Sequence, residues 1–308
     1  MTPSQVTNCV SFKNVLVATD FSEVSRSALH SAAAIARAHQ GQIFIAHVME
    51  PIQPGRPWLV HKPSSLDPGH AAVEYRMQVF AGEECLAQIP HTEIVERGET
   101  CERISELIDR EHIDLLVLGT HARAGMRKLR LGSVTEELFR LVSCPVMTVG
   151  PEAGDEPRRF EQILFATDFG PASHAALPYA VALANENSAG LTLLHVIPFL
   201  PPLSVGAGWY PGADPDQMLE RDSRQAQDKL RALVPSDELH TGKPELAVVF
   251  DDVPAGILKA AAAHHADLIV MGVKASSIGG AWRSAHLPWA TAHEVVGHAS
   301  CPVITVRA

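Results

Sequence analysis

Short apolar runs alternate with amphipathic segments along the first half of the chain. Val15–Ala18 is a continuous apolar run, and Ile113–Leu118 ends in Leu-Val-Leu. Both are short enough to be strands buried in a parallel sheet. Between them lies a predicted helix that Ser22 begins and Gly41 ends. Its apolar stripe consists of Ala28, Leu29, Ala32, Ile35 and Ala36.

The rest of this half continues the alternation. Strands that alternate with helices predict a parallel, doubly wound sheet of the α/β class. In such sheets ligands bind beyond the carboxyl ends of the strands, where the strand order reverses. The further elements predicted are strand Ile43–Val48, a helix near Ala71–Gln88, strand Glu93–Glu96, a helix around Glu102–Arg110, a helix starting at Ser133 with apolar positions Val134, Leu138 and Leu141, and strand Val146–Val149.

The second half of the chain repeats the first. Asn14–Ser22 (NVLVATDFS) matches Gln162–Gly170 (QILFATDFG) at an offset of 148 residues. The offset grows to 153 for the pair DLLVLG and DLIVMG, and to 157 for the two CPV motifs. We therefore predict one domain duplicated, with the copies at 1–150 and 151–308 and a polar seam at Pro151–Arg159.

Composition narrows the function classes. The 308 residues carry a formal net charge of -10, which is unfavourable for general binding to nucleic acid because phosphate neutralisation supplies most of that affinity. The five cysteines form no CxxC motif, and the chain shows neither a signal-peptide layout nor an apolar run of the ~18 residues needed to span a membrane. A cytoplasmic protein that binds neither nucleic acid nor membranes is expected. The 16 histidines form no HExxH or comparable ligand set, so no metal site is predicted.

The segment Gly119–Pro145 carries the main candidate chemistry. A glycine-bearing loop follows a predicted strand there and leads into the helix at Ser133, where backbone amides and the helix dipole can bind an anion. Four basic residues in the loop make phosphate the first anion to consider: Arg123, Arg127, Lys128 and Arg130. A solvated basic face would explain the same pattern, and the loop has neither GxxxxGK nor GxGxxG. Asp20, just beyond the first strand, could likewise be only a turn residue.

The repeat and this loop together resemble a tandem universal stress protein over nearly the whole of both copies. The ATP-binding branch of that family has a loop of the form G-x2-G-x9-G-[ST], to which Gly119, Ala122 and Gly132-Ser133 correspond here. The resemblance implies two adenine-nucleotide alpha-hydrolase-like domains, each with a five-stranded sheet ordered 3-2-1-4-5. It also implies pairing between the two domains of the chain, and ATP, usually with Mg2+, as the ligand.

The resemblance also implies roles for individual residues. Asp20 and the neighbourhood of Val48 would hold adenine and ribose, while the loop amides, Ser133 and Thr135 would hold the phosphates. The predicted nucleotide-binding residues are Ala18, Thr19, Asp20, Val48, Gly119, Ala122, Arg123, Gly125, Gly132, Ser133, Val134 and Thr135.

Two departures from the motif qualify this prediction. Ala122 replaces the second glycine of the first copy. In the second copy Ala275 stands at that position and Trp289-Ala290 stands where the first copy has Gly132-Ser133. An indole would fill the phosphate position, so we predict a degenerate second site and one nucleotide per chain.

The sequence therefore predicts an ATP-binding stress-response switch whose nucleotide lies in the N-terminal domain. No motif supplies a recognisable general base, so hydrolysis is expected to be slow at most. The alternative is a nucleotide-independent stress or scaffold protein whose two domains serve dimerisation and partner binding. A homo-oligomer and an unknown protein partner are compatible with both. His47 and His195 hold equivalent strand positions and are interpreted as packing residues.

Overall fold

The computed structural model describes residues 10–50, 69–120, 133–153, 159–198, 215–235, 238–274 and 290–308. Ser11–Arg158 form one compact unit, and Arg159–Ala308 form the body of a second. We call them the N-terminal and the C-terminal unit. Each contributes five strands, and the two units are described separately.

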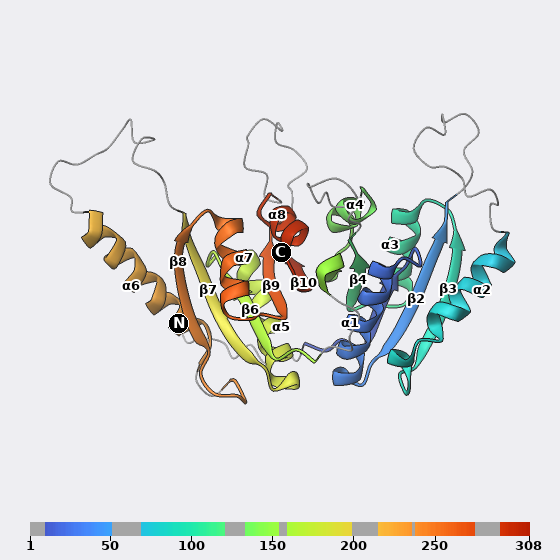
Figure 1. Ribbon diagram of the computed structural model, residues 1–308, viewed down its shortest axis with the longest axis horizontal. Helices are drawn as coiled ribbons and strands as arrows, with labels where there is room; N and C mark the ends of the chain where they lie inside the picture. The colour runs from blue at the N-terminus through green and yellow to red at the C-terminus, as the bar shows by residue number, and fades with distance from the viewer. Residues whose placement is uncertain are drawn as a thin grey trace. The chain divides into compact units, whose positions relative to one another are not determined.

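The N-terminal unit is a five-stranded parallel sheet in the order β3-β2-β1-β4-β5. Figure 1 shows these strands side by side, with helices packed against them. The strand order reverses between β1 and β4, because the chain first adds β2 and β3 on one side of β1 and then returns to the other side. Its elements are β1 (Asn14–Ala18), α1 (Glu23–His39), β2 (Gln42–Met49), α2 (His70–Ala81), η1 (Glu84–Leu86), β3 (His91–Arg97), α3 (Thr100–Arg110), β4 (Leu115–Gly119), α4 (Ser133–Leu141), β5 (Val146–Val149) and η2 (Pro151–Ala153).

The C-terminal unit repeats this topology in the order β8-β7-β6-β9-β10, with all neighbouring strands parallel. The predicted α/β fold of two doubly wound domains with 3-2-1-4-5 strand order is therefore confirmed. Its elements are β6 (Gln162–Ala166), α5 (Pro171–Asn187), β7 (Gly190–Pro198), α6 (Pro215–Leu233), β8 (Glu245–Asp251), α7 (Val253–Ala263), β9 (Leu268–Val273), α8 (Ala290–His298) and β10 (Val303–Arg307).

The central strand of each unit is buried on both faces. Val15, Leu16 and Val17 of β1 are fully buried, as expected of an apolar run inside a parallel sheet. The five apolar residues predicted for the stripe of α1 are each 1% exposed or less, and α1 packs on β1, β4 and β5. Ser22 caps α1 through its side chain, which accepts a hydrogen bond from the Ser25 amide. These predictions are confirmed.

Gly41 does not end α1 in the way predicted. The helix ends at His39, and Gln40 adopts the left-handed conformation at φ 52°. A glycine is needed at position 41 because a side chain would not fit there. A Cβ would lie 2.5 Å from the Phe12 carbonyl oxygen and 2.8 Å from that of Lys13. The long helix predicted near Ala71–Gln88 is also shorter, since α2 ends at Ala81 and a short 3-10 turn follows.

Helix α4 begins at Ser133 as predicted, but its buried face differs. Leu141 is 54% exposed, whereas Thr135, Leu138 and Phe139 are buried. The inward stripe therefore starts at Thr135 and not at Val134. Among the described residues, no helix combines the length and the apolar character that crossing a membrane requires.

Candidate functional site

A tight turn follows β1 and presents Asp20 at the carboxyl edge of the sheet. The Asp20 carboxylate oxygen Oδ1 accepts hydrogen bonds from the Ser22 amide at 3.0 Å and from the Ser25 hydroxyl at 2.6 Å. The buried Thr19 hydroxyl accepts a hydrogen bond from the Phe21 amide at 2.9 Å. Phe21 has a φ of 63°, which is uncommon for an aromatic residue. The exposed Asp20 side chain is thus a helix-start residue that lies at the carboxyl edge of the sheet.

His47 of β2 supports this turn from the neighbouring strand. Its Nδ1 lies 2.7 Å from the Thr19 carbonyl oxygen, and its ring centroid lies 4.5 Å from that of Phe21. Because a carbonyl can only accept, the Nδ1 atom carries a proton. Burial, together with the nearby Arg76 cation, lowers the pKa of His47, although the hydrogen bond to Thr19 and the Asp20 charge oppose this. The interpretation of His47 as a packing residue is confirmed.

Arg76 of α2 is a site residue that the sequence did not reveal. Its guanidinium carbon lies 4.5 Å from the centre of the Phe21 ring, and Nη2 donates to the Asp20 carbonyl oxygen at 3.5 Å. A cation over an aromatic ring is attracted by the ring quadrupole. Nothing in the spacing of α2 singles this arginine out, because the contact depends on how the helix packs beside the turn.

Gly119 ends β4 beside the turn, since Ala18 of β1 pairs in register with Leu118 of β4. A Cβ at Gly119 would lie 2.9 Å from the backbone carbon of Val24 and 3.0 Å from the Ser25 amide nitrogen. The glycine is therefore required by the close packing of β4 against the first turn of α1. Ala18 and Val48, also predicted to bind the nucleotide, are both half-buried at the ends of their strands.

The start of α4 belongs to the same edge. Because β4 and β5 are parallel, the chain must return from the carboxyl edge to the opposite edge, and α4 is the helix that makes this return. Ser133 is exposed at its first position, Val134 is half-buried, and Thr135 is buried at 6% exposure. The other residues predicted for the loop lie outside the described residues: Ala122, Arg123, Gly125 and Gly132.

The C-terminal unit contains the same turn. The Asp168 oxygen Oδ1 accepts hydrogen bonds from the Gly170 amide at 2.8 Å and from the Ser173 hydroxyl at 2.5 Å. Phe169 has a φ of 59° and stacks on His195, with 4.4 Å between ring centroids, which confirms the packing role of that histidine too. The His195 Nδ1 lies 2.8 Å from the Thr167 carbonyl oxygen.

A lysine distinguishes the second turn from the first. Lys274, just beyond β9, places its Nζ 3.5 Å from the Asp168 oxygen Oδ2. Burial alone would raise the pKa of Asp168, but the hydrogen bonds from Ser173 and Gly170 and the charge of Lys274 outweigh it, so the pKa is lowered. Asp168 is therefore an ionised carboxylate at neutral pH.

A cavity of about 280 Å³ opens beside this second turn. It lies at the carboxyl ends of β6, β7 and β9 and is bounded by α5, α7 and α8. Trp289 and Ala275, on which the predicted degeneracy depended, lie outside the described residues. Among the described residues, the cavity is lined by Ala166, Thr167, Asp168, Ala172, Ser173, Leu194, Val196, Ile257, Met271, Gly272, Lys274, Thr291 and Ala292.

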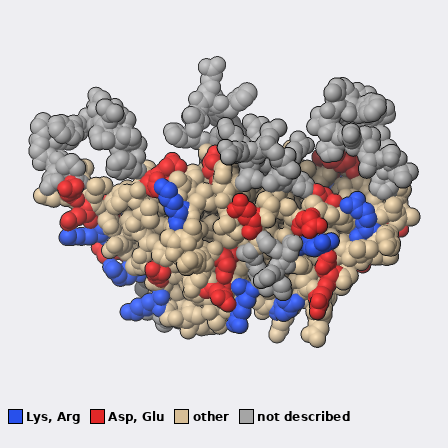
Figure 2. Space-filling model, in the orientation of Figure 1, with Lys and Arg blue, Asp and Glu red and all other residues tan. Residues whose placement is uncertain are grey.

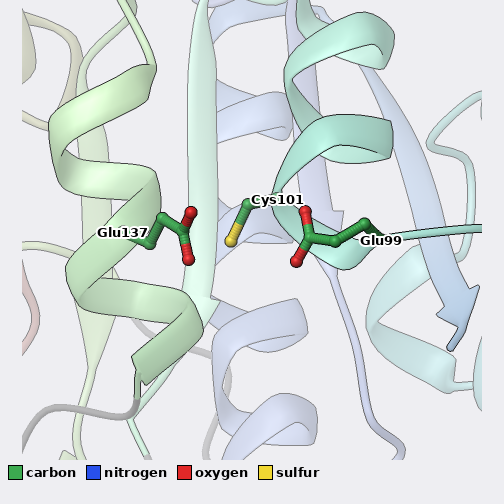
Figure 3. Close-up of side chains that lie close together, drawn as sticks. All are labelled: Glu99, Cys101 and Glu137. Carbon is green, nitrogen blue, oxygen red and sulfur yellow. The ribbon is translucent and has the colours of Figure 1, made fainter. Parts of the chain in front are cut away.

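A second group of polar side chains lies where α3 packs against α4. Figure 3 shows the Cys101 thiol between the carboxylates of Glu99 and Glu137, with one ligand-type atom of each residue within 4.8 Å of the others. The Glu99 carboxylate caps α3 by accepting from the Glu102 amide at 3.0 Å, and the Cys101 thiol donates to the Val134 carbonyl oxygen at 3.8 Å. Burial and the two carboxylates raise the pKa of Cys101 to about 12, which keeps the thiol protonated. Helix capping by Glu99 and packing of Cys101 between α3 and α4 account for these two side chains.

Basic side chains do not gather into one large patch on the face shown in Figure 2. There, the described Lys and Arg residues are interspersed with Asp and Glu. That surface provides no continuous track for a phosphate backbone.

The model of the universal stress protein family matches residues 11–150 and again residues 159–307. The chain belongs to the universal stress protein family. Both units match, so the predicted tandem arrangement is confirmed.

Curated relatives align with about one unit of the chain. Universal stress protein MJ0531 of Methanocaldococcus jannaschii is 30% identical over 144 residues, which is 45% of this chain and 82% of the relative. A universal stress protein of Thermus aquaticus, from the QAH/OAS sulfhydrylase 3′ region, is 28% identical over 139 residues, which is 45% of this chain and 98% of the relative.

Two solved structures align with nearly the whole chain. Protein PA1789 of Pseudomonas aeruginosa, described as functionally unknown, is 17% identical with a TM-score of 0.65 and covers 97% of this chain and 94% of its own. A universal stress protein of Archaeoglobus fulgidus is 20% identical with a TM-score of 0.61 and covers 96% of this chain and 98% of its own. These likenesses concern the fold.

Proposed function

We propose that the N-terminal unit of this universal stress protein binds an adenine nucleotide, ATP, at the carboxyl edge between β1 and β4. The observation that carries the proposal is the convergence of Asp20, Gly119 and Ser133 on the edge where the strand order reverses. Nucleotides bind at such a position in open α/β sheets. The resemblance of the Gly119–Ser133 segment to the family's ATP-binding loop supports the same assignment.

The described residues fit the parts of ATP. The Asp20 carboxylate is held by two hydrogen bonds and is exposed, which suits a ribose hydroxyl. The exposed Ser133 hydroxyl and the first amides of the nine-residue helix α4 suit phosphate oxygens. Mg2+ would be held mainly by the phosphates, as is usual for this ion. When bound, ATP would supply the negative charge and the oxygen acceptors for the Ser133 hydroxyl and the first amides of α4.

The buried Thr135 has a different role in this proposal. It lies on the inner face of α4 with Leu138 and Phe139, so it fixes the position of the helix start. The proposed function is then a binding switch, in which occupancy of the edge changes the surface offered to a protein partner. Pairing of the two units, a homo-oligomer and a cytoplasmic location remain predictions, and catalysis beyond slow hydrolysis is not part of the proposal.

A pair of serine substitutions on α4 and just beyond it tests the site. Ser133→Asp places a negative charge where the phosphates would lie, and we expect at least a tenfold loss of ATP-Mg2+ affinity by titration calorimetry. The helix should tolerate the change, because aspartate is favourable at a helix N-terminus. Ser143→Asp, an exposed position beyond the other end of α4, is the matched control and should bind within twofold of the wild type.

A thermal-shift measurement gives an independent readout. ATP at ~100 times its Kd should add about 2.7 kcal/mol to the stability of the binding unit. No shift in the wild type, or equal affinities for the two serine variants, would contradict the proposal. The nucleotide-independent scaffold would then be the better description of the protein.

A further inference from the structure

The side chains of Glu99, Cys101 and Glu137 converge where α3 packs on α4 in the N-terminal unit. Glu99 precedes α3, Cys101 lies in its first turn, and Glu137 lies in the second turn of α4. One ligand-type atom of each residue lies within 4.8 Å of the other two, and Figure 3 shows the thiol between the two carboxylates. One sulfur and two oxygens, supplied by two helices, are thus close enough to share one metal ion.

Helix capping and packing leave part of this arrangement unexplained. The cap uses the Glu99 oxygen Oε2, which leaves Oε1 available to a ligand. Glu137 is exposed and therefore free to turn toward water, but its carboxylate lies beside the buried thiol. Both carboxylates are thus already placed where a shared cation would need them.

The electrostatic potential at the thiol is negative. Burial raises the pKa of Cys101, and the charges of Glu137, Glu99 and Glu50 raise it further. The same charges attract a cation. A bound divalent metal ion reverses their effect on the thiol, because it stabilises the thiolate and displaces the thiol proton to water.

The ligand types favour zinc. Zn2+ accepts both thiolate and carboxylate ligands, whereas Mg2+ and Ca2+ prefer oxygen alone. Bond lengths of about 2.0–2.3 Å place neighbouring ligand atoms of a tetrahedral Zn2+ site roughly 3.3–3.7 Å apart. The separations here extend to 4.8 Å, so small rotations of the two exposed glutamate side chains would complete the geometry.

A separate observation on α3 also points to a ligand. Ser105 follows Cys101 by four residues and so lies on the same face of the helix. Its Oγ atom is buried and has no hydrogen-bond partner in the part of the chain that the structure describes. Such a group calls for an explanation, and a water molecule or an ion is a common one. Water bound to a metal ion at this helix interface would supply the missing partner.

We propose that Glu99, Cys101 and Glu137 bind one Zn2+ ion, with water at the fourth coordination position. The ion joins α3 to α4 and thereby fixes the relative position of two helices of the N-terminal unit. This site goes beyond the proposed nucleotide binding, and none of its residues is assigned to ATP.

The test is a spectroscopic titration of the full chain with Co2+, which replaces Zn2+ in such sites and shows a charge-transfer absorption band when a thiolate binds it. The protein is freed of metal with EDTA, kept reduced without added thiols, and titrated in the absence of nucleotide. We expect a thiolate-to-cobalt band that saturates at one ion per chain. An equal amount of Zn2+ should remove the band, whereas a large excess of Mg2+ should not.

Two pairs of variants locate the site. Cys101→Ser should abolish the band, whereas Cys85→Ser, which changes a half-buried thiol outside the group, should keep it. Glu137→Gln changes an exposed position that tolerates substitution, and we expect at least a tenfold loss of Co2+ affinity. Asp109→Asn, which changes an exposed carboxylate near the other end of α3, is its matched control and should bind within twofold of the wild type. Circular dichroism and thermal unfolding check that each variant is folded.

Three results would overturn the proposal: no charge-transfer band in the wild type, an unchanged band in Cys101→Ser, or unchanged Co2+ affinity in Glu137→Gln. The Ser133→Asp experiment measures ATP affinity, whereas these titrations contain no nucleotide. A chain that binds Co2+ but not ATP would therefore refute the proposed function and leave this inference intact, and the reverse result would do the opposite.

Discussion

Phe21 and Phe169 occupy left-handed backbone positions directly after the two strand-end aspartates. Each conformation is fixed locally, because a threonine hydroxyl two residues earlier accepts from the phenylalanine amide at 2.9 Å. A histidine ring from the next strand stacks on each phenylalanine. The aspartate between threonine and phenylalanine is thus positioned by the turn itself.

Gly272 provides a sharp test of packing at the residue scale. A Cβ there would overlap the backbone of Ala172 and Ser173, whereas a Cβ at Gly69 meets nothing within 4 Å. We expect Gly272→Ala to lower the free energy of unfolding by about 1–3 kcal/mol, which is typical of overpacking. Gly69→Ala meets no such overlap, so its cost should be limited to the poorer capping of α2 by alanine, about 0.5–1 kcal/mol. Urea denaturation followed by circular dichroism would measure both, and equal midpoints would contradict the assigned role.

Single residues show where the sequence was informative and where it was not. The apolar runs and the Asp-Phe repeat located the turns, since strand ends are marked by the loss of apolar character. The left-handed phenylalanines and the Arg76 contact could not be predicted, because both depend on three-dimensional neighbours. Gly119 is another example. It belongs to the predicted loop motif, but the structure needs a glycine there because a Cβ would meet the backbone of α1.

At the scale of elements, α3 and α4 pack through a buried thiol and not through apolar residues alone. Cys101 is 1% exposed and lies between the carboxylates of Glu99 and Glu137. The incorrect prediction for Leu141 belongs here as well. Spacing shows that α4 is amphipathic, but the buried Thr135 shifts the inward face, and a threonine is not counted when an apolar stripe is traced.

The described cysteines with raised pKa values should resist alkylation in the folded protein. Burial raises the pKa of Cys85 to about 11, and those of Cys101 and Cys144 to about 12. Iodoacetamide reacts with the thiolate, so at pH 8 we expect little labelling in the native state. In denaturant, where an unperturbed thiol has a pKa of about 8.5, labelling should be complete. Peptide mass spectrometry would measure this, and rapid native labelling of Cys101 would contradict the packing described.

The same thiols imply a pH dependence of stability. Their folded-state pKa values lie above the unfolded value, so folding favours the protonated form. This contribution is fully present below about pH 8.5 and is lost as the pH rises toward the folded-state values.

At the scale of the whole molecule, two units of the same fold present different side chains at equivalent edges. The topology could be predicted almost completely, because a duplicated alternation of strands and helices admits few arrangements. The cavity of the second unit could not be predicted from the sequence. The prediction that Trp289 fills the phosphate position stays a prediction, because Trp289 lies outside the described residues. The walls are made by side chains from β7, β9 and α7, whose convergence becomes visible only in three dimensions.

Each unit should fold without the other. Residues 11–158 and 159–308 each belong to a compact unit with a buried central strand, and domains of ~150 residues bury about 68–70% of their surface. Expressed separately, each fragment should unfold cooperatively when followed by circular dichroism. ATP-Mg2+ should raise the melting temperature of the first fragment only. A fragment without a cooperative transition would show that the units stabilise each other.

The hydrogen bonds within the two turns after β1 and β6 have a consequence for how the sequence of the protein can change during evolution. Each aspartate is oriented in part by its own backbone neighbours and by a serine five residues later, so this part of its placement is built into the turn. Substitutions around such a turn should then leave the turn itself in place. A duplicated gene of this design keeps two copies of one preformed strand end, each able to change its surroundings independently.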